Sequence, residues 1–419
     1  MPVTFEERPN REVAGNVRDR MAVRMDAYAE MLPEIHARAF AVSGIEDMKQ
    51  LHRIEEAIAR IPEGGDWKEA RRQIAAELGD PEKNAHRAET VLRTNCFEAY
   101  AAARYRAAQA DKDVMPYLVY HCVGDDRVRP EHRALDGTVL PVDDPFWETH
   151  YPPWDWGCRC TVSGMTQLEH DEEMAAAKDG GDTAFKFPTQ AQLSKIPGAA
   201  PSGFSFNPKS LAMDLDDLNG RKYAGPSKMR AFSRKMLEHE TEDAQGRRET
   251  VWDWLVRKQM EKDAERLREG IMSTGATETV IVRDYETGGG LLVENGKPKT
   301  VGGDRARRLF DAARRSDRRL VAIHRHTGGR SAVPSPEDVL MALNPASERQ
   351  HVVSSYDSAT VSVSEAGRFS TPHAIEREVE EQRRKLESGE IDLDAWATWL
   401  KGQPWAKYNQ KGWMEGLRP

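Results

Sequence analysis

Two histidines, a serine and an aspartate lie close together in the segment VAIHRHTGGRSAVPSPED, which begins at Val321. His324 and His326 stand at positions i and i+2 at the end of an apolar stretch, so their imidazoles share one face of an extended strand. Asp338 follows near the start of an expected helix, for which Ser335 is a good N-cap residue. Two imidazoles and a carboxylate suit Zn²⁺, and three protein ligands leave a fourth position for water, as catalytic zinc requires.

A hydrolytic zinc site also needs a carboxylate that accepts a proton from the attacking water. Glu278 is our candidate, because it begins the apolar strand ETVIVRDY, where its direction can be fixed. Glu286 and Glu294 are alternatives for the same role. A metal-free α/β domain with a histidine pair exposed at a strand end is the other interpretation of the motif.

A second group of candidate metal ligands surrounds the sequence WGCRC. Cys158 and Cys160 are two of the four cysteines in the chain, and in an extended segment their sulfurs lie on the same side. With His132, and with His121 or Cys122 as the fourth ligand, they would form a tetrahedral structural zinc site. The alternative is two thiols that pack in a loop. We expect no disulfide between them, because a bridge across one residue is strained and the low cysteine content indicates a reducing compartment.

Composition limits the classes of partner. The chain has 419 residues, of which 39% are hydrophobic and 31% charged, and its formal net charge is −8. Bulk charge therefore does not attract nucleic acid or an anionic membrane, and no apolar run of about 18 residues would span a bilayer. Seven arginines between Arg305 and Arg319 are typical of a solvated helix face, and a contact with DNA or another protein is the alternative.

The pattern of elements predicts an α+β multidomain chain. Apolar residues recur at helical spacing between Arg11 and Ala110, where we expect a long helix from about Pro81 to Ala110 and Asp66 as the cap of the helix before it. We expect a helical-rich N-terminal domain over 1–168, followed by a flexible connector over 169–227 that is rich in Gly, Pro and charged residues. A charged helical segment over 228–276, a small α/β domain over 277–364 and a helical C-terminal tail over 365–419 complete the expected chain.

Several separated motifs between residues 93 and 160 resemble the minor head proteins of tailed phages named after the F protein of phage Mu. In order, the motifs are RTN at Arg93–Asn95, AY at Ala99–Tyr100, DDRVRPEH at Asp125–His132, LDG at Leu135–Gly137, DDPFW at Asp143–Trp147, PP at Pro152–Pro153 and CRC at Cys158–Cys160. The resemblance covers about 11–168. It implies a head morphogenesis domain without known catalysis, in a protein that associates with the portal and capsid and is packaged with the genome.

The region Thr277–Ser364 resembles the JAMM metalloproteases, which include de-ubiquitinating isopeptidases and RadC-like bacterial proteins. The resemblance implies that His324, His326 and Asp338 bind zinc, that Glu278 is the acid/base, and that Ser335 stabilises the tetrahedral intermediate. The spacing departs from the family, because eight residues separate His326 from Ser335 where seven are usual.

Together these patterns predict a phage minor head protein, located in the virion and in the host cytoplasm during assembly. The C-terminal domain is expected to be a zinc hydrolase that cuts a peptide or isopeptide bond in a host protein after ejection with the phage DNA. The expected partners are the portal and capsid proteins, with packaged DNA as a further candidate and no membrane. The alternatives are a purely structural head protein and a fused nuclease toxin.

Overall fold

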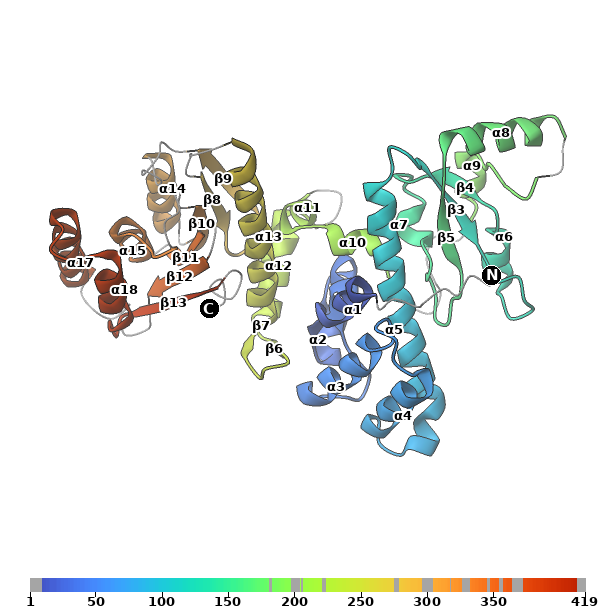
Figure 1. Cartoon of the computed structure of the whole chain (residues 1–419), viewed down its shortest axis with the longest axis horizontal. Helices are drawn as coiled ribbons and strands as arrows, with labels where there is room; N and C mark the ends of the chain where they lie inside the picture. The colour runs from blue at the N-terminus through green and yellow to red at the C-terminus, as the bar shows by residue number, and fades with distance from the viewer. Residues whose placement is uncertain are drawn as a thin grey trace, which may run out of the picture. The chain divides into compact units, whose positions relative to one another are not determined.

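The computed structural model describes most of the chain in two compact units (Figure 1). The described residues are 10–180, 183–196, 204, 206–220, 224–274, 279–295, 304–316, 318–325, 332–344, 347–353, 357–363 and 372–412. The first unit comprises Met1–Met213 and His239–Glu249, and the second comprises Asp214–Glu238 and Thr250–Pro419. Each unit combines helices with a sheet, which confirms the α+β class, and none of the described helices has the length and apolar content to cross a bilayer.

The first unit begins with a helical core. Its elements are α1 (Arg11–Arg18), β1 (Met21–Ala22), α2 (Met25–Glu30), the 3₁₀ helix η1 (Pro33–Arg38), β2 (Ala39–Phe40), α3 (Met48–Ala59), α4 (Trp67–Glu77) and α5 (Pro81–Ala110). Aspartates cap the last three helices; Asp66, as predicted, accepts a hydrogen bond from the amide of Glu69. The predicted apolar face of α3 is buried, with Leu51, Ile54 and Ile58 all 0% exposed.

A three-stranded antiparallel sheet forms the other half of this unit. β3 (Tyr117–His121) lies between β4 (Val139–Pro141) and β5 (Thr161–Met165), with Tyr120 opposite Val162. Besides β4, the irregular stretch between β3 and β5 contains the short helices α6 (Pro130–Ala134) and α7 (Trp147–His150). Aromatic residues of this stretch, Trp147, Tyr151 and Trp154, are buried against Tyr120 and so give the stretch a core.

The expected flexible connector over 169–227 is not confirmed. Its described part contains most of α8 (Gln167–Lys178), then α9 (Gln190–Leu193), α10 (Pro208–Ala212), α11 (Leu215–Asn219) and the start of α12 (Gly225–Met236). Leu193, Phe204 and Phe206 are buried in the same core as Tyr120. A few well-spaced apolar side chains are thus enough to dock a segment that is otherwise rich in polar residues.

A hairpin of β6 (Glu240–Glu242) and β7 (Arg248–Thr250) follows α12, and residues 239–249 belong to the first unit. The Thr241 hydroxyl donates to the Ala22 carbonyl at 2.6 Å, and His52 Nε2 lies 2.6 Å from the Glu242 carbonyl oxygen. The chain therefore returns to the first unit after it has begun the second.

The second unit is built around a six-stranded sheet in the order β13-β12-β11-β10-β8-β9. The strands are β8 (Thr279–Asp284), β9 (Gly290–Asn295), β10 (Leu320–Arg325), β11 (Ser347–Val353), β12 (Asp357–Val363) and β13 (Ala406–Gly412). The β10–β11 pair is parallel and the other pairs are antiparallel. The order of elements from β8 to β12 agrees with the predicted α/β domain, whereas the expected helical tail also supplies a strand, β13.

Helices cover this sheet and pack against one another. They are α13 (Val251–Thr274), α14 (Asp304–Arg315), α15 (Pro336–Ala342), α17 (Pro372–Ser388) and α18 (Leu393–Lys401). Phe310 of α14 packs against the apolar face of β8 and β10. Trp396 and Leu400 of α18, both 0% exposed, form a second cluster with Val339 of α15.

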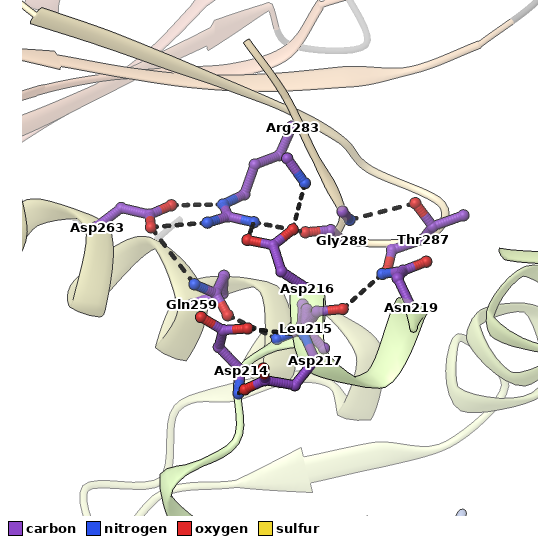
Figure 2. A network of polar contacts seen from close by, with 12 residues as sticks. Asp214, Leu215, Asp216, Asp217, Asn219, Gln259, Asp263, Arg283, Thr287 and Gly288 are labelled. Carbon is purple, nitrogen blue, oxygen red and sulfur yellow. Dashed lines mark hydrogen bonds and ion pairs between the residues drawn. The ribbon is translucent and has the colours of Figure 1, made fainter. Parts of the chain in front are cut away.

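A buried polar network joins α11, α13 and β8 (Figure 2). The guanidinium of Arg283 donates to both carboxylate oxygens of Asp263, at 2.5 and 2.8 Å. Asp216 and the Gly288 carbonyl accept from the same Arg283 nitrogen, and Gln259 connects Asp263 with the amide of Leu215. Burial lowers the pKa of Arg283, but its carboxylate partners outweigh this effect and keep the guanidinium charged.

Candidate metal centre

His132, Cys158 and Cys160 come together in the first unit, as their residue types predicted. His132 lies in the short helix α6, which begins at Pro130, and the two cysteines directly precede β5. All three side chains are buried, with exposed fractions of 2%, 4% and 7%. The pairing of β5 with β3 fixes the end of the long irregular stretch beside α6.

The distances between the donor atoms suit a tetrahedral ion. His132 Nδ1 lies 3.5 Å from Cys158 Sγ and 3.7 Å from Cys160 Sγ, and all three donor atoms lie within 4.8 Å of one another. Zinc–sulfur and zinc–nitrogen bonds of about 2.3 and 2.0 Å at tetrahedral angles place N and S about 3.5 Å apart. The imidazole nitrogen therefore lies from each sulfur at about the distance that one zinc ion requires.

Aromatic groups fix the orientation of these donors. The Trp154 ring stacks on the His132 imidazole at 4.2 Å with an interplanar angle of 16°. The Trp154 indole donates to the Tyr120 hydroxyl at 2.9 Å, and that hydroxyl hydrogen-bonds the Cys160 sulfur. Sequence reasoning did not identify these neighbours of the cysteines. Tyr120 is distant in the sequence, and although Trp154 lies only four residues before Cys158, the direction of its ring depends on the fold of the loop.

The electrostatics of the cluster favour one thiolate. A hydrogen bond from Cys160 lowers the pKa of Cys158, burial opposes this, and His132 lowers it further. The same interaction with Cys158 raises the pKa of Cys160, since two adjacent buried thiolates would repel each other. A bound cation would compensate the charge on both sulfurs, which is the usual state of cysteine ligands.

The expected fourth ligands do not join the group. His121 Nε2 lies 2.8 Å from the Ser163 hydroxyl, and neither His121 nor Cys122 belongs to the cluster of donors. Within the described part of the chain, the Nε2 atom of His132 is buried without a hydrogen-bond partner. All four cysteines are free thiols.

The second predicted site lies in the second unit and is only partly within the described residues. His324, at the end of β10, is 4% exposed, and its Nε2 lies 3.1 Å from Asp338 Oδ1 on α15. Ser335 caps α15 as predicted, and its amide donates to Asp338 Oδ2 at 2.6 Å. The structure thus brings His324 and Asp338 together, whereas His326 and Glu278 lie outside the described residues.

Comparison with known proteins relates the first unit to a family. The model of the family "Phage Mu protein F like protein" matches residues 52–163, which include His132, Cys158 and Cys160. The "Putative capsid assembly protein F" of Escherichia phage Mu is 30% identical over 339 residues, which cover 68% of this chain and 73% of that protein. The chain belongs to the phage Mu F-like family.

A second relative matches a shorter region of this Mu F-like protein. The "Mu-like prophage FluMu F protein" of Haemophilus influenzae is 39% identical over 158 residues, which cover 33% of this chain and 37% of that relative. The chain thus spans little more than a third of that relative. No solved structure matches the chain.

Proposed function

We propose that this Mu F-like protein takes part in phage head assembly and is a minor component of the head. The 30% identity to the capsid assembly protein F of phage Mu, over 339 residues, carries this proposal. The partners would be portal and capsid proteins, because these are the proteins present at the assembling head. Packaged DNA is a further candidate partner.

The test is the composition of assembled particles. Proheads and mature particles purified from the phage or prophage that encodes the chain should contain it when digested and examined by mass spectrometry. A frameshift in its gene should reduce the yield of complete heads in electron micrographs. Particles that lack the chain at every stage of assembly, with normal yields from the frameshift, would refute the proposal.

We propose that His132, Cys158 and Cys160 hold a structural zinc ion in the head morphogenesis domain. The supporting observations are the 3.5 and 3.7 Å distances between the imidazole nitrogen and the sulfurs, and their nearly complete burial. The ion would cross-link α6 to the segment before β5. Such a cross-link stabilises a long loop that has few hydrogen-bonded elements of its own.

Metal analysis of matched variants tests this site. The full chain, purified without chelators, should contain about one equivalent more zinc than Cys160→Ser or His132→Ala. Cys96→Ala is the control, because Cys96 is equally buried, at 1% exposed, in the helical core of the same unit. Equal zinc content in wild type and Cys160→Ser would exclude the site.

We propose a second candidate function, a zinc hydrolase in the second unit, whose substrate would be a peptide or isopeptide bond of a host protein. The distance of 3.1 Å between His324 Nε2 and Asp338 Oδ1 supports it, because two of the three expected ligands converge. His326 would complete the set, and a bound zinc would supply a water of lowered pKa. Glu278 would accept the proton of that water, and Ser335 would stabilise the oxyanion.

Replacement of a ligand and of the base should have different effects in the full-length protein. His326→Ala should lose zinc and hydrolysis together, whereas Glu278→Gln should retain zinc and lose about 10²–10⁴-fold in rate. Cleavage is measured on host-cell lysate by mass spectrometry of new peptide termini. Degradation of RNA or DNA instead of protein would indicate that the unit is a nuclease. Absence of zinc from this unit would indicate that its role is purely structural.

A further inference from the structure

A third cysteine, Cys122, lies at the end of strand β3 beside the proposed structural zinc site. The antiparallel register of β3 and β5 ends with His121 opposite Thr161. Continued by one residue, this register places Cys122 opposite Cys160. Cys122 also packs against the hydrophobic core to which Cys160 belongs. Two elements that are distant in the sequence therefore bring the two cysteines to the same place.

Backbone hydrogen bonds show which kind of pair Cys122 and Cys160 form. The Tyr120 amide donates to the Thr138 carbonyl at 2.9 Å, and the Cys122 amide donates to the Asp136 carboxylate at 2.8 Å. Both acceptors come from the segment just before β4, which lies on the opposite side of β3 from β5. The two amides thus point away from β5, so Cys122 and Cys160 form a non-hydrogen-bonded pair. Such pairs have Cα atoms about 4.5 Å apart, with the closest side chains of an antiparallel sheet.

The alternation of side chains along β3 decides between the two fourth ligands that the sequence left open. Tyr120 and Cys122 share one face of the strand, and Tyr120 belongs to the same core as Cys160. His121 lies on the other face, where its Nε2 atom is 2.8 Å from the Ser163 hydroxyl. Cys122 therefore faces the cysteine ligands, whereas His121 faces away from them.

The distances allow one ion to bind a sulfur from each strand. Two sulfurs bound to one tetrahedral zinc lie about 3.8 Å apart when each zinc–sulfur bond is about 2.3 Å long. Facing Cβ atoms of an antiparallel pair lie about 4.5–5.5 Å apart, so two sulfurs that lean toward each other reach this separation. The Cys122 sulfur lies outside the group of three donors, but Cys122 is only partly buried. Its side chain can therefore turn about the Cα–Cβ bond toward the ion.

We propose that Cys122 is the fourth ligand of the structural zinc ion. It would complete a Cys₃His set with His132, Cys158 and Cys160, which is a usual set for a closed structural site. Asp136 lies two residues beyond α6, so its bond to the Cys122 amide already holds the end of β3 beside that helix. The ion would then join three segments of the domain: the end of β3, α6 and the residues before β5. This inference rests on the proposed zinc site.

Cobalt substitution counts the thiolate ligands of this site. Co²⁺ binds the same nitrogen and sulfur ligands as zinc, and its thiolate bonds give a near-ultraviolet band that the proposed site of the second unit, which has no cysteine, does not contribute. At saturating Co²⁺ this band of the full-length protein should fall by about a third in Cys122→Ser, because two of three thiolates remain. His121→Ala and Cys96→Ala are the matched controls and should keep the wild-type band, since Cys96 is a buried thiol of the helical core.

Zinc affinity tests whether Cys122 binds the ion or only packs beside it. The assay is competition with a chromophoric chelator in the His326→Ala protein, so that zinc in the second unit does not contribute. Residues that merely orient a ligand are worth about 10–100-fold in metal affinity, so Cys122→Ala should weaken zinc binding at least about tenfold. Cys122→Asp should recover most of this loss, because a carboxylate binds zinc but does not replace a packed thiol.

X-ray absorption at the zinc edge of the His326→Ala protein counts the ligands without any change to Cys122, and it remains decisive if the Cys122 variants do not fold. Three sulfurs per zinc are expected. Two sulfurs per zinc, or an unchanged cobalt band in Cys122→Ser, would overturn the fourth ligand and leave the site of three donors. A wild-type protein without any thiolate band would refute the proposed zinc site itself, and this inference with it.

Discussion

Removing one partner of the Arg283–Asp263 pair should destabilise the second unit strongly. Asp263 is 0% exposed and Arg283 is 3% exposed, so neither charge is solvated by water. The two carboxylate oxygens of Asp263 accept from the guanidinium at 2.5 and 2.8 Å. In Asp263→Asn the guanidinium stays buried but loses its buried charged partner and one of these two acceptors. Breaking a buried pair in this way costs about 3–5 kcal/mol in the free energy of unfolding.

A second carboxylate on the same guanidinium provides the control. Asp216 also lies 2.8 Å from Arg283, but its side chain is 44% exposed, so water screens this contact. Asp216→Asn should therefore cost only about 0–1 kcal/mol. The double replacement of Asp263 by Leu and Arg283 by Met should recover most of the loss, because it leaves no buried charge without a partner.

Urea unfolding of the full-length protein, combined with hydrogen exchange of α13 and β8, measures these effects separately from the first unit. Asp263→Asn should shift the transition of α13 and β8 to lower urea and leave α3 and α5 unchanged. If Asp263→Asn and Asp216→Asn cost the same, or if the double replacement costs as much as the single one, the importance assigned to burial is wrong.

Three further predictions concern the first unit. Burial raises the pKa of Glu55 from 4.5 to about 7, so the folded state binds this proton more tightly than the unfolded state does. The free energy of unfolding should therefore fall by up to about 3 kcal/mol as pH rises through this range. Urea titrations at pH 5 and 8 measure this fall, and it should be smaller in Glu55→Gln. Leu92→Ala, at a position 0% exposed on α5, should cost about 2–5 kcal/mol in the same assay, and a loss below 1 kcal/mol would contradict its place in the core. Gly137→Ala should lower the free energy of unfolding clearly more than Gly124→Ala. Both glycines have positive φ, 76° and 78°, a conformation that costs an alanine about 1–2 kcal/mol. Only at Gly137 would the new Cβ also overlap a backbone atom, the Ala184 carbonyl oxygen. Equal melting temperatures for the two glycine variants would show that the Ala184 segment moves away easily.

The elements that could be predicted from the sequence are those with a local signal. The helix from Pro81 to Ala110 begins with a proline after the capping residue Asp80, and both its predicted ends agree with the structure. The α/β order from β8 to β12 follows from alternating apolar and charged stretches. Strand β13, AKYNQKG, carries no such alternation, and it forms because it pairs with β12. The docking of Phe204 and Phe206 also depends on contacts with distant residues, which composition does not reveal.

In the candidate sites, too, features with a local sequence signal could be predicted, whereas those that depend on distant contacts could not. The alternation of side chains along an extended segment predicted that Cys158 and Cys160 share one side. The known types of zinc ligand predicted His132 as the third member of the cluster. The fourth ligand could not be chosen correctly, because the directions of His121 and Cys122 depend on the register of β3 against β5. His324 and Asp338 were predicted to converge because a strand end and a helix start meet there, and the structure places their side chains 3.1 Å apart.

The path of the chain has a consequence for how such proteins can exchange parts. The polypeptide passes between the two units at Met213, at Glu238 and at Glu249. A recombination that replaced everything after Met213 would remove the hairpin that binds Ala22 and His52 in the first unit. One that replaced everything after Glu249 would leave Asp214 and Asp216 without Arg266 and Arg283. Neither join transfers an intact unit. A join after β8 would also fail, because β8 pairs with β9 and β10 of the same sheet. A new second unit can therefore be acquired intact only together with the hairpin that lies between its two parts in the sequence.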